Sequence, residues 1–182
     1  MSKRESYHLR PLEESDLEKV LGWRNSAKIR ANMYTDHIIS IQEHKAWFEG
    51  AQLDKNSRYL IFELQGRPVG FVSFTNIDQK NSRCYWAFYI GEEDIPQGTG
   101  AFMEFFAIEY AFEVLRIRKL CCEVFVFNFS VIKLHNKFGF TEEGRFVKHV
   151  LKNNIYEDVV SLALFNNDWV DISNRLQKVL FR

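Results

Sequence analysis

Two glycines near the middle of the chain could form a turn that binds an anion. Gly98 and Gly100 lie in the segment DIPQGTGAF, residues 94–102, directly before an apolar run that predicts a helix. The first amides of a helix lack intrahelical partners and carry partial positive charge, so a turn at this position suits a phosphate group. The pair lacks the complete patterns of a dinucleotide fold or a P-loop, and a helix cap without a ligand stays an alternative.

A histidine follows on a second predicted helix, residues 128–137. The helical spacing places four side chains on the face toward the interior: Val131, Leu134, His135 and Phe138. Lys133 and Lys137 fall on a different side, where both could reach a phosphate. An interior imidazole is either a hydrogen-bonded core residue or a group that moves protons.

Glu123 is a carboxylate in an otherwise apolar predicted strand, residues 120–127. A buried carboxylate is costly unless it is paired or its pKa is raised, and a carboxylate with a raised pKa is a candidate general base. A structural ion pair is the open alternative. The three cysteines, Cys84, Cys121 and Cys122, show neither zinc-binding spacing nor an evident histidine partner, so we expect buried thiols, a reducing compartment and no metal site.

The elements that must position these residues form an α+β pattern. Alternation and turn residues predict strands at residues 7–10, 58–64, 67–77, 84–90, 120–127, 140–151 and 156–165. Helices are predicted from a cap at Ser15 to about residue 25, at 28–32, after a cap at Ser40, after Gly100, at 128–137 and at 167–180. The apolar helix after Gly100 returns the chain to a parallel strand. We therefore expect one domain over residues 1–182, with a mixed central sheet of about seven strands flanked by helices.

The composition excludes several classes of function. The 182 residues are 46% apolar, with 17 phenylalanines, which predicts a packed globule. Lys+Arg and Asp+Glu both number 24, so the net charge favours neither nucleic acid nor a membrane as a partner. Neither a membrane span of roughly 20 apolar residues nor a signal peptide is evident. We expect a cytoplasmic protein.

The glycine turn and the second helix, in this order, resemble two motifs of the GNAT superfamily of acetyl-CoA-dependent N-acetyltransferases. Residues 97–102, QGTGAF, are similar to the family's pyrophosphate loop, Arg/Gln-x-x-Gly-x-Gly/Ala, with Phe102 in place of the final small residue. Residues 128–140, NFSVIKLHNKFGF, are similar to its second motif, Asn-x-x-Ala-x-x-Leu-Tyr-x-Lys-x-Gly-Phe, with His135 in place of the tyrosine.

The resemblance implies that acetyl-CoA lies between the fourth and fifth strands, which splay apart. It assigns the cofactor contacts to these residues: Phe88, Tyr89, Ile90, Gln97, Gly98, Thr99, Gly100, Ala101, Phe102, Asn128, Lys133 and Lys137. The three strand residues and Asn128 would contact the pantetheine, the amides of residues 98–102 would hold the pyrophosphate, and a lysine would approach the nucleotide phosphate. By similarity, His135 would protonate the leaving thiolate. Glu123, through a water and Ser73, would be the base, and a backbone N–H near Tyr89 or Ile90 would stabilise the oxyanion.

A narrower resemblance appears in the N-terminal part. The segments WRN at residues 23–25, MY at 33–34, IIS at 38–40 and EHKAWF at 43–48 are similar to a subgroup that acetylates the 4-amino group of a UDP-linked 4-amino-4,6-dideoxy sugar. That reaction belongs to pseudaminic (nonulosonic) acid biosynthesis, which supplies flagellin or surface glycans. The resemblance implies an acceptor pocket lined by five residues: Arg24, Asn25, Met33, Tyr34 and His44. The planar fork of Arg24 suits a diphosphate, and a structural helix cap is its alternative role.

Two other functions stay open. Acetylation of protein N-termini, as in ribosomal-protein acetyltransferases, predicts an open acidic groove. A CoA-binding module without turnover is the other alternative, because His135 stands where the family has tyrosine. Many relatives dimerise, so we also expect a homodimer.

Overall fold

The computed structural model describes residues 2–182, so Met1, the first residue of the predicted domain, lies outside the described residues. Seven strands form one sheet in the order β1-β2-β3-β4-β5-β7-β6. The strands are β1 (Tyr7–Pro11), β2 (Arg58–Leu64), β3 (Arg67–Asp78), β4 (Arg83–Ile90), β5 (Lys119–Phe125), β6 (Thr141–Lys152) and β7 (Ile155–Phe165). Only β4 and β5 pair in parallel among the described strands. The expected mixed α+β sheet is confirmed, and the extent of the domain stays a prediction.

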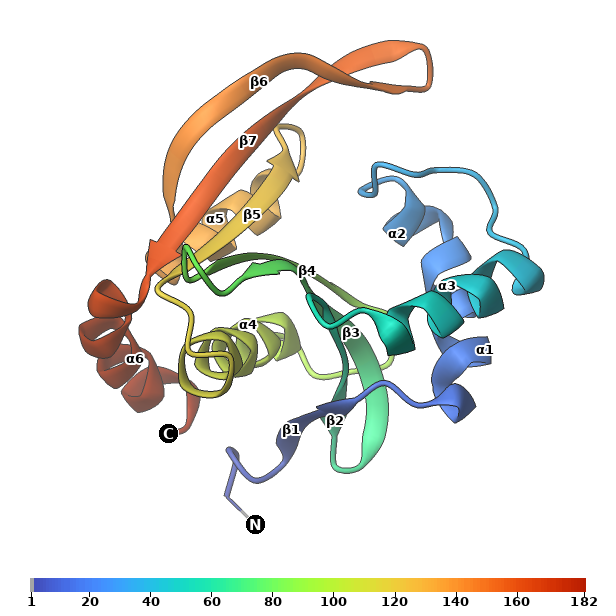
Figure 1. The fold of residues 1–182 in the computed structure, drawn as a ribbon. Coiled ribbons are helices and arrows are strands. Elements are labelled where there is room, and N and C mark those ends of the chain that lie inside the picture. Colours follow the sequence, from blue (N-terminus) through green and yellow to red (C-terminus); the bar gives the residue numbers. More distant parts are fainter. Residues whose placement is uncertain (1) are drawn as a thin grey trace.

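Helices cover both faces of this sheet. They are α1 (Leu17–Asn25), α2 (Ala27–Arg30), α3 (Ile41–Leu53), α4 (Thr99–Glu109), α5 (Phe129–Lys137) and α6 (Asn166–Leu180), with a short 3₁₀ turn, η1 (Glu14–Asp16), and a π-helical end of α4, η2 (Tyr110–Val114). Figure 1 shows α1, α2 and α3 grouped on one side and α4 and α6 on the other. Within residues 2–182, no helix has the length and apolar character needed to cross a membrane.

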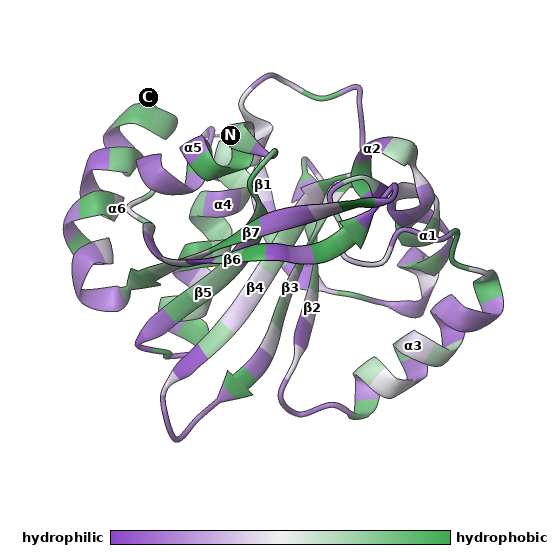
Figure 2. Cartoon of the chain, turned by 90° about the horizontal axis from the view of Figure 1, so that it is seen from above, coloured by the Kyte–Doolittle hydropathy of each residue, from purple (hydrophilic) through white to green (hydrophobic). Residues whose placement is uncertain are grey.

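Two apolar clusters follow from the alternation of side chains along the strands. Val72 of β3 packs into a large cluster with residues of α4, whereas its neighbour Phe71 packs with Trp23 of α1. In Figure 2, α3 and α6 carry alternating hydrophobic and hydrophilic segments, as expected of helices that cover a sheet with one side only. We call the sheet side with α4 and α5 the cofactor face, and the side with α1, α2 and α3 the acceptor face.

β4 and β5 separate after three residue pairs. Arg83, Cys84 and Tyr85 pair with residues 119–121 of β5. Beyond them, β4 continues to Ile90 and β5 to Phe125 without further pairing between the two strands in the described chain. Backbone groups that face such a gap need another hydrogen-bonding partner. The expected splay between the fourth and fifth strands is confirmed.

The β6–β7 hairpin reaches across the acceptor face. Asn153 and Asn154 turn the chain with φ of 49° and 63°, a left-handed conformation that asparagine tolerates in tight hairpin turns. Figure 1 shows the tip of the hairpin extending toward α2. At that tip, the buried Lys152 donates a hydrogen bond of 2.6 Å from Nζ to the carbonyl of Met33 and lies 3.5 Å from Asp36. A single side chain thus joins the hairpin to the loop after α2.

The first helical turn differs from the prediction. We expected Ser15 to cap the helix, but a reciprocal capping box instead joins Glu13 and Asp16 around η1, and α1 begins at Leu17. The reason is a tertiary contact: Asp16 is held by Arg10, which bonds both of its carboxylate oxygens at 2.6 and 2.7 Å.

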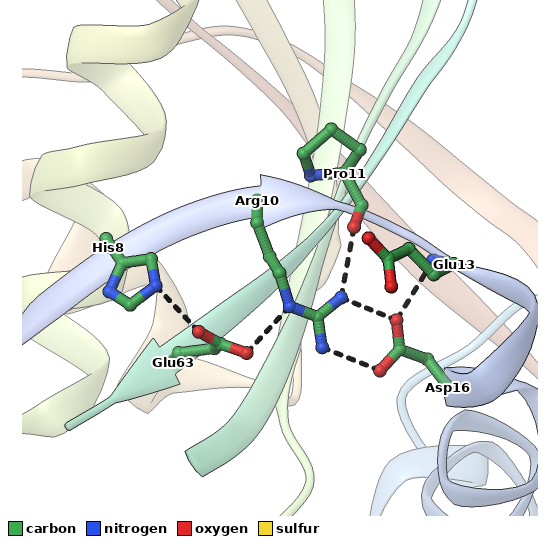
Figure 3. Close-up of polar contacts among 6 residues, drawn as sticks. All are labelled: His8, Arg10, Pro11, Glu13, Asp16 and Glu63. Atoms are coloured by element: carbon green, nitrogen blue, oxygen red, sulfur yellow. Dashed lines mark hydrogen bonds and ion pairs between the residues drawn. The ribbon is translucent and has the colours of Figure 1, made fainter. Parts of the chain in front are cut away.

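Arg10 joins this turn to the sheet, as Figure 3 shows. Its Nε donates to Glu63 of β2 at 2.7 Å, and His8 contacts the same carboxylate at 2.6 Å. Asp16 and Glu63 are both buried. Burial disfavours the charged form of Asp16, but hydrogen bonds from Arg10 and from the Glu13 amide outweigh it and lower the pKa of this carboxyl. The network therefore anchors the start of α1, and with it the acceptor face, to β1 and β2.

Candidate active site

The turn before α4 presents two unused amides. Gly98 has φ of +90°, which glycine adopts without strain. The amides of Thr99 and Ala101 donate within the turn, to Pro96 and Gly98. Among the described residues, the amides of Gly98 and Gly100 donate to no backbone acceptor, and a Cβ at either position would meet nothing within 4 Å. Two of the five expected amides, those of Thr99 and Ala101, are thus used within the turn, whereas those of Gly98 and Gly100 stay available at a helix N-terminus and suit a phosphate.

The gap between β4 and β5 is lined as the resemblance implies. A cavity of about 320 Å³ lies there. Six of the predicted cofactor and catalytic residues line it: Phe88, Tyr89, Ile90, Glu123, Asn128 and His135. A narrow channel with unpaired strand edges and an open phosphate seat nearby fits an extended cofactor that carries amides in its middle and phosphates at one end.

His135 lies on the cofactor face of this cavity and is paired with Glu104 of α4. Nδ1 of the ring is 2.8 Å from Oε1 of the carboxylate, and the two residues are 2% and 0% exposed. The second carboxylate oxygen of Glu104 has no partner in the described chain. Burial disfavours charge on the imidazole, but the neighbouring Cys122 and Glu104 outweigh it and raise the pKa of His135 to about 10. Cys122 lies beside this ring, a neighbour that the sequence did not make evident, and the expected burial of all three thiols is confirmed.

A second cavity of about 410 Å³ lies on the acceptor face. It adjoins the first, because Met33, Ala87, Phe88 and Tyr89 line both. Besides Phe88 and Tyr89, four predicted site residues line this second cavity: Arg24, Met33, His44 and Ser73. Trp47, Tyr59 and Phe71 add aromatic surface to its walls. Aromatic walls of this kind suit a planar ring.

The guanidinium group of Arg24 is only partly hydrogen-bonded inside this cavity. One guanidinium nitrogen, Nη2, donates to the carbonyl of Thr35 at 2.8 Å, but Nη1 is buried without a hydrogen-bond partner in the described chain. Burial lowers the pKa of Arg24. His44 likewise has a buried, unpartnered Nε2, and burial lowers its pKa, so its ring is neutral near pH 7. A buried donor without a partner is costly, so a ligand with acceptor atoms would stabilise this site.

A family model supplies the identification. The model for the acetyltransferase (GNAT) domain matches residues 9–160. The chain belongs to the GNAT acetyltransferase family. It is an N-acetyltransferase with acetyl-CoA as the acetyl donor, in agreement with the motifs at Gly98 and His135.

Relatives of two kinds are similar to this GNAT chain. Spermidine N(1)-acetyltransferase of Escherichia coli is 25% identical over 170 residues, which is 93% of this chain and 91% of the relative. Acetyltransferase PseH of Campylobacter jejuni is 29% identical over 132 residues, 71% of this chain and 80% of the relative. The crystal structure of spermidine N-acetyltransferase from Vibrio cholerae in complex with CoA and spermine superimposes with a TM-score of 0.86 at 23% identity, over 91% of this chain and 99% of the other. The last comparison shows the shared GNAT fold.

Two predicted acceptor residues of the GNAT site act outside the acceptor cavity. Asn25 holds the loop after α2, because its side chain exchanges two hydrogen bonds of 2.9 Å with the backbone of Ile39. Tyr34 donates its hydroxyl to Glu123. Burial and this carboxylate raise the pKa of Tyr34, so the phenol stays protonated. Both residues thus shape the site from its edge.

Glu123 is not buried, contrary to expectation. Its side chain is exposed because β4 has moved away from β5 at that point, and it lies on the acceptor face, opposite His135. Ser73 is on the same face, but its hydroxyl contacts the carbonyl of Ala87 at 3.4 Å and no hydrogen bond joins it to Glu123 in the described chain. The two predicted proton-transfer groups, His135 and Glu123, therefore flank the gap from opposite faces of the sheet.

Some predicted cofactor residues lie at the periphery. Gln97, Lys133 and Lys137 are exposed and line neither cavity, so only a long ligand could reach them. The Phe102 ring stacks on Tyr7 with centroids 4.4 Å apart. The larger residue at this motif position thus fills the core behind the turn.

The sequence reasoning missed two residues of the site. Glu104 interrupts an apolar helix, and that interruption was a readable signal of a buried partner. Lys152 gave no signal, since it precedes a hairpin turn where lysine is common. Within residues 2–182, no group of three or more histidine, cysteine or acidic side chains could hold a metal ion.

Proposed function

We propose that this enzyme acetylates the 4-amino group of a UDP-linked 4-amino-4,6-dideoxy sugar, a step of pseudaminic acid biosynthesis. The observation that supports this substrate is the buried, unpartnered Nη1 of Arg24 in an aromatic cavity that adjoins the cofactor cleft. A diphosphate would complete the guanidinium fork, and the aromatic walls would accept the uracil or the sugar methyl group. The relative PseH, 29% identical, supports the same proposal.

Spermidine is the second candidate, because spermidine N(1)-acetyltransferase matches more of the chain. A polyamine carries several positive charges and needs carboxylates for recognition. Glu43 lines the acceptor cavity, but it lies at an exposed position and already contacts His37 at 3.0 Å. Arg24 would repel a polycation in the same cavity. The charges of the pocket therefore favour the nucleotide sugar.

The residues of the cleft divide the chemistry between the two faces. Bound acetyl-CoA would supply an acetyl group already activated as a thioester, seated by the Gly98 and Gly100 amides, the β4 edge and Asn128. On the acceptor face, Glu123, acting through a water and Ser73, would take a proton from the substrate ammonium. On the cofactor face, His135 would donate a proton to the leaving sulfur, and a β4 amide near Tyr89 would stabilise negative charge on the carbonyl oxygen.

A thiol-release assay with three acceptors tests the proposal. Acetyl-CoA is combined with a UDP-4-amino-4,6-dideoxy sugar, with spermidine, or with a ribosomal-protein N-terminal peptide. We expect turnover with the sugar, and release with spermidine or peptide alone would overturn the assignment. The enzyme should work in the cytoplasm, in keeping with three free, buried cysteines. The expected homodimer also stays a prediction, which light scattering would test; a Vibrio cholerae spermidine N-acetyltransferase is described as dodecameric.

Arg24→Gln sharpens that assay. Loss of a charge-assisted hydrogen bond should raise KM for the sugar by about tenfold or more, with kcat for any small neutral amine unchanged. Arg24→Lys should recover little, since the ammonium lacks the planar fork. Arg30→Gln is the matched control, because Arg30 also bonds the loop after α2, at the carbonyl of Asp36, but does not line the cavity. Equal KM values for Arg24→Gln and Arg30→Gln would contradict a diphosphate site.

A further inference from the structure

The Glu104–His135 pair lies on the cofactor face, where α4 crosses α5. Both residues are essentially inaccessible to solvent, yet His135 still lines the cleft between β4 and β5. The rings of Trp86, Phe88 and Phe140 surround the imidazole, with centroids 5.0 to 5.8 Å away. The rotation of the ring is therefore fixed by packing on its sides and by Glu104 at Nδ1.

Stability alone gives a weak account of this pair. Replacing a buried charged pair with apolar residues of similar volume is often neutral or stabilising, because removing two charges from water is expensive. Glu104 also leaves one buried carboxylate oxygen without a partner in the described chain. Every neighbouring position of α4, residues 101–108, is otherwise apolar. A carboxylate at such a cost points to a role through the partner it has among residues 2–182, the imidazole of His135.

The geometry decides which ring nitrogen faces the cleft. Nδ1 faces Glu104, and Nε2 is on the opposite edge of the ring. Burial raises the pKa of the Glu104 carboxyl, and the pKa of His135 is raised as well, so the pair holds a proton between Nδ1 and the carboxylate near neutral pH. Nε2 is absent from the buried, unpartnered atoms, in contrast to Nε2 of His44. The titratable groups that face the ring are Glu104 from α4 and Cys122 from β5. Cys122 and Glu104 together favour the positive charge on the ring, and because Nδ1 faces Glu104, Nε2 is the ring nitrogen left for the cleft that His135 lines.

We propose that Glu104 is a positioning residue that holds His135 as an Nδ1-bonded imidazolium whose Nε2–H serves as the proton donor to the leaving thiolate. The inference rests on the proposed function and adds a residue to it. As the C–N bond to the amine forms, the C–S bond breaks, and sulfur leaves with the electron pair and takes the Nε2 proton. The amine gives its proton to Glu123 or solvent, and the neutral imidazole regains a proton from water.

Nitrogen-15 NMR of the protein without substrate tests the positioning directly. The chain has five histidines, and His135→Gln identifies the signals of His135 by their loss. We expect the imidazole of His135 to stay protonated well above pH 7, with Nδ1 in a strong hydrogen bond. Glu104→Gln should move this titration to lower pH by at least about one unit. Glu109→Gln is the matched control on the same helix, because Glu109 pairs with Arg4 away from the cleft.

Kinetics test the consequence. Glu104→Gln should lower kcat by about tenfold, part of the roughly 10² to 10⁴ that a general acid supplies, and should shift the basic limb of the kcat profile to lower pH, while KM for acetyl-CoA changes little. The double variant Glu104→Gln/His135→Phe should have the same kcat as His135→Phe alone. A His135 titration that is ordinary, or identical in Glu104→Gln, would overturn this inference even if turnover is normal. Absence of turnover with every amine would instead reject the proposed function.

Discussion

The cofactor face and the acceptor face treat buried charge in opposite ways. On the cofactor face, the imidazole of His135 is paired within the protein, 2.8 Å from Glu104. On the acceptor face, Arg24 and His44 each keep a buried nitrogen without a partner in the described chain. Buried polar atoms without partners are stable only if the rest of the fold holds them in place. The cofactor face thus supplies its buried imidazole with a carboxylate from the protein, although one oxygen of that carboxylate stays unpaired, whereas the acceptor face leaves a guanidinium nitrogen for a ligand.

The two faces also differ in how they are assembled. The cofactor face is built by consecutive segments, with β4, the Gly98 turn, α4, β5 and α5 following one another along the chain. The acceptor face needs α1 to α3, the face of β3 and the tip of the β6–β7 hairpin, where Lys152 bonds the carbonyl of Met33 across 119 residues. Changes to the residues that hold each face in place should therefore separate the roles of the two faces, with effects on the free energy of unfolding that range from several kcal/mol to a fraction of one.

Arg10→Met should destabilise the protein most. Removal of the guanidinium leaves the buried carboxylates of Asp16 and Glu63 without their shared cation, a loss of about 3 to 5 kcal/mol. Urea unfolding measures it. Arg4→Met is the control, because the Arg4–Glu109 pair involves an arginine that is 44% exposed, and should cost less than about 1 kcal/mol. Equal losses would show that the Arg10 network does not anchor the acceptor face.

Gly91→Ala should disturb the acceptor face alone. A Cβ at this position would overlap the ring of Trp23, which precedes Arg24 on α1 and donates to Glu92 at 3.1 Å. Overpacking of this kind costs about 1 to 3 kcal/mol, and the displaced helix should raise KM for the acceptor more than Kd for CoA. Gly22→Ala on the same helix meets nothing within 4 Å and should be neutral or slightly stabilising. If the affinity for CoA fell as much as the affinity for the acceptor, the prediction that only the acceptor face is disturbed would be wrong.

Low pH should weaken the Arg10–Asp16 interaction that anchors the acceptor face. The folded-state pKa of Asp16 is lowered below its unfolded value, so its contribution to stability is complete above the unfolded pKa of about 4 and is lost as the pH falls through the folded pKa. The unfolding free energy should therefore fall as the pH drops below about 4, and Asp16→Asn should flatten that part of the curve. An unchanged slope in Asp16→Asn would remove the carboxylate from the network.

Gly100→Ala should scarcely alter the stability of the fold but should weaken the binding of the cofactor. Gly100 has ordinary helical geometry, and an added Cβ meets open space, so the unfolding free energy should change by less than about 0.5 kcal/mol. The methyl group would extend toward the proposed phosphate seat, and calorimetry should show CoA binding weakened by about 1 kcal/mol. Gly50→Ala in α3 is the control with equal space around it. Unchanged CoA affinity would place the phosphates elsewhere.

The order and type of the elements were predictable because local signals produce them. The Asn153–Asn154 turn, the glycine turn and the apolar α4 all depend on backbone preferences and side-chain period, which neighbours in the sequence determine. The Ser15 cap failed for the opposite reason. Its alternative, the Glu13–Asp16 box, is favoured by Arg10, which sits on another element.

The sequence by itself determined the family, the cofactor motifs and the presence of His135 on an inward helix face. The tertiary structure decided what surrounds them: that Glu104 fixes the ring of His135, that Glu123 is exposed at a strand edge, and that Tyr34 and Asn25 support the acceptor cavity from outside it. The physical reason is distance along the chain. Periodicity reports which face a side chain occupies, but burial and pairing depend on which other element meets that face.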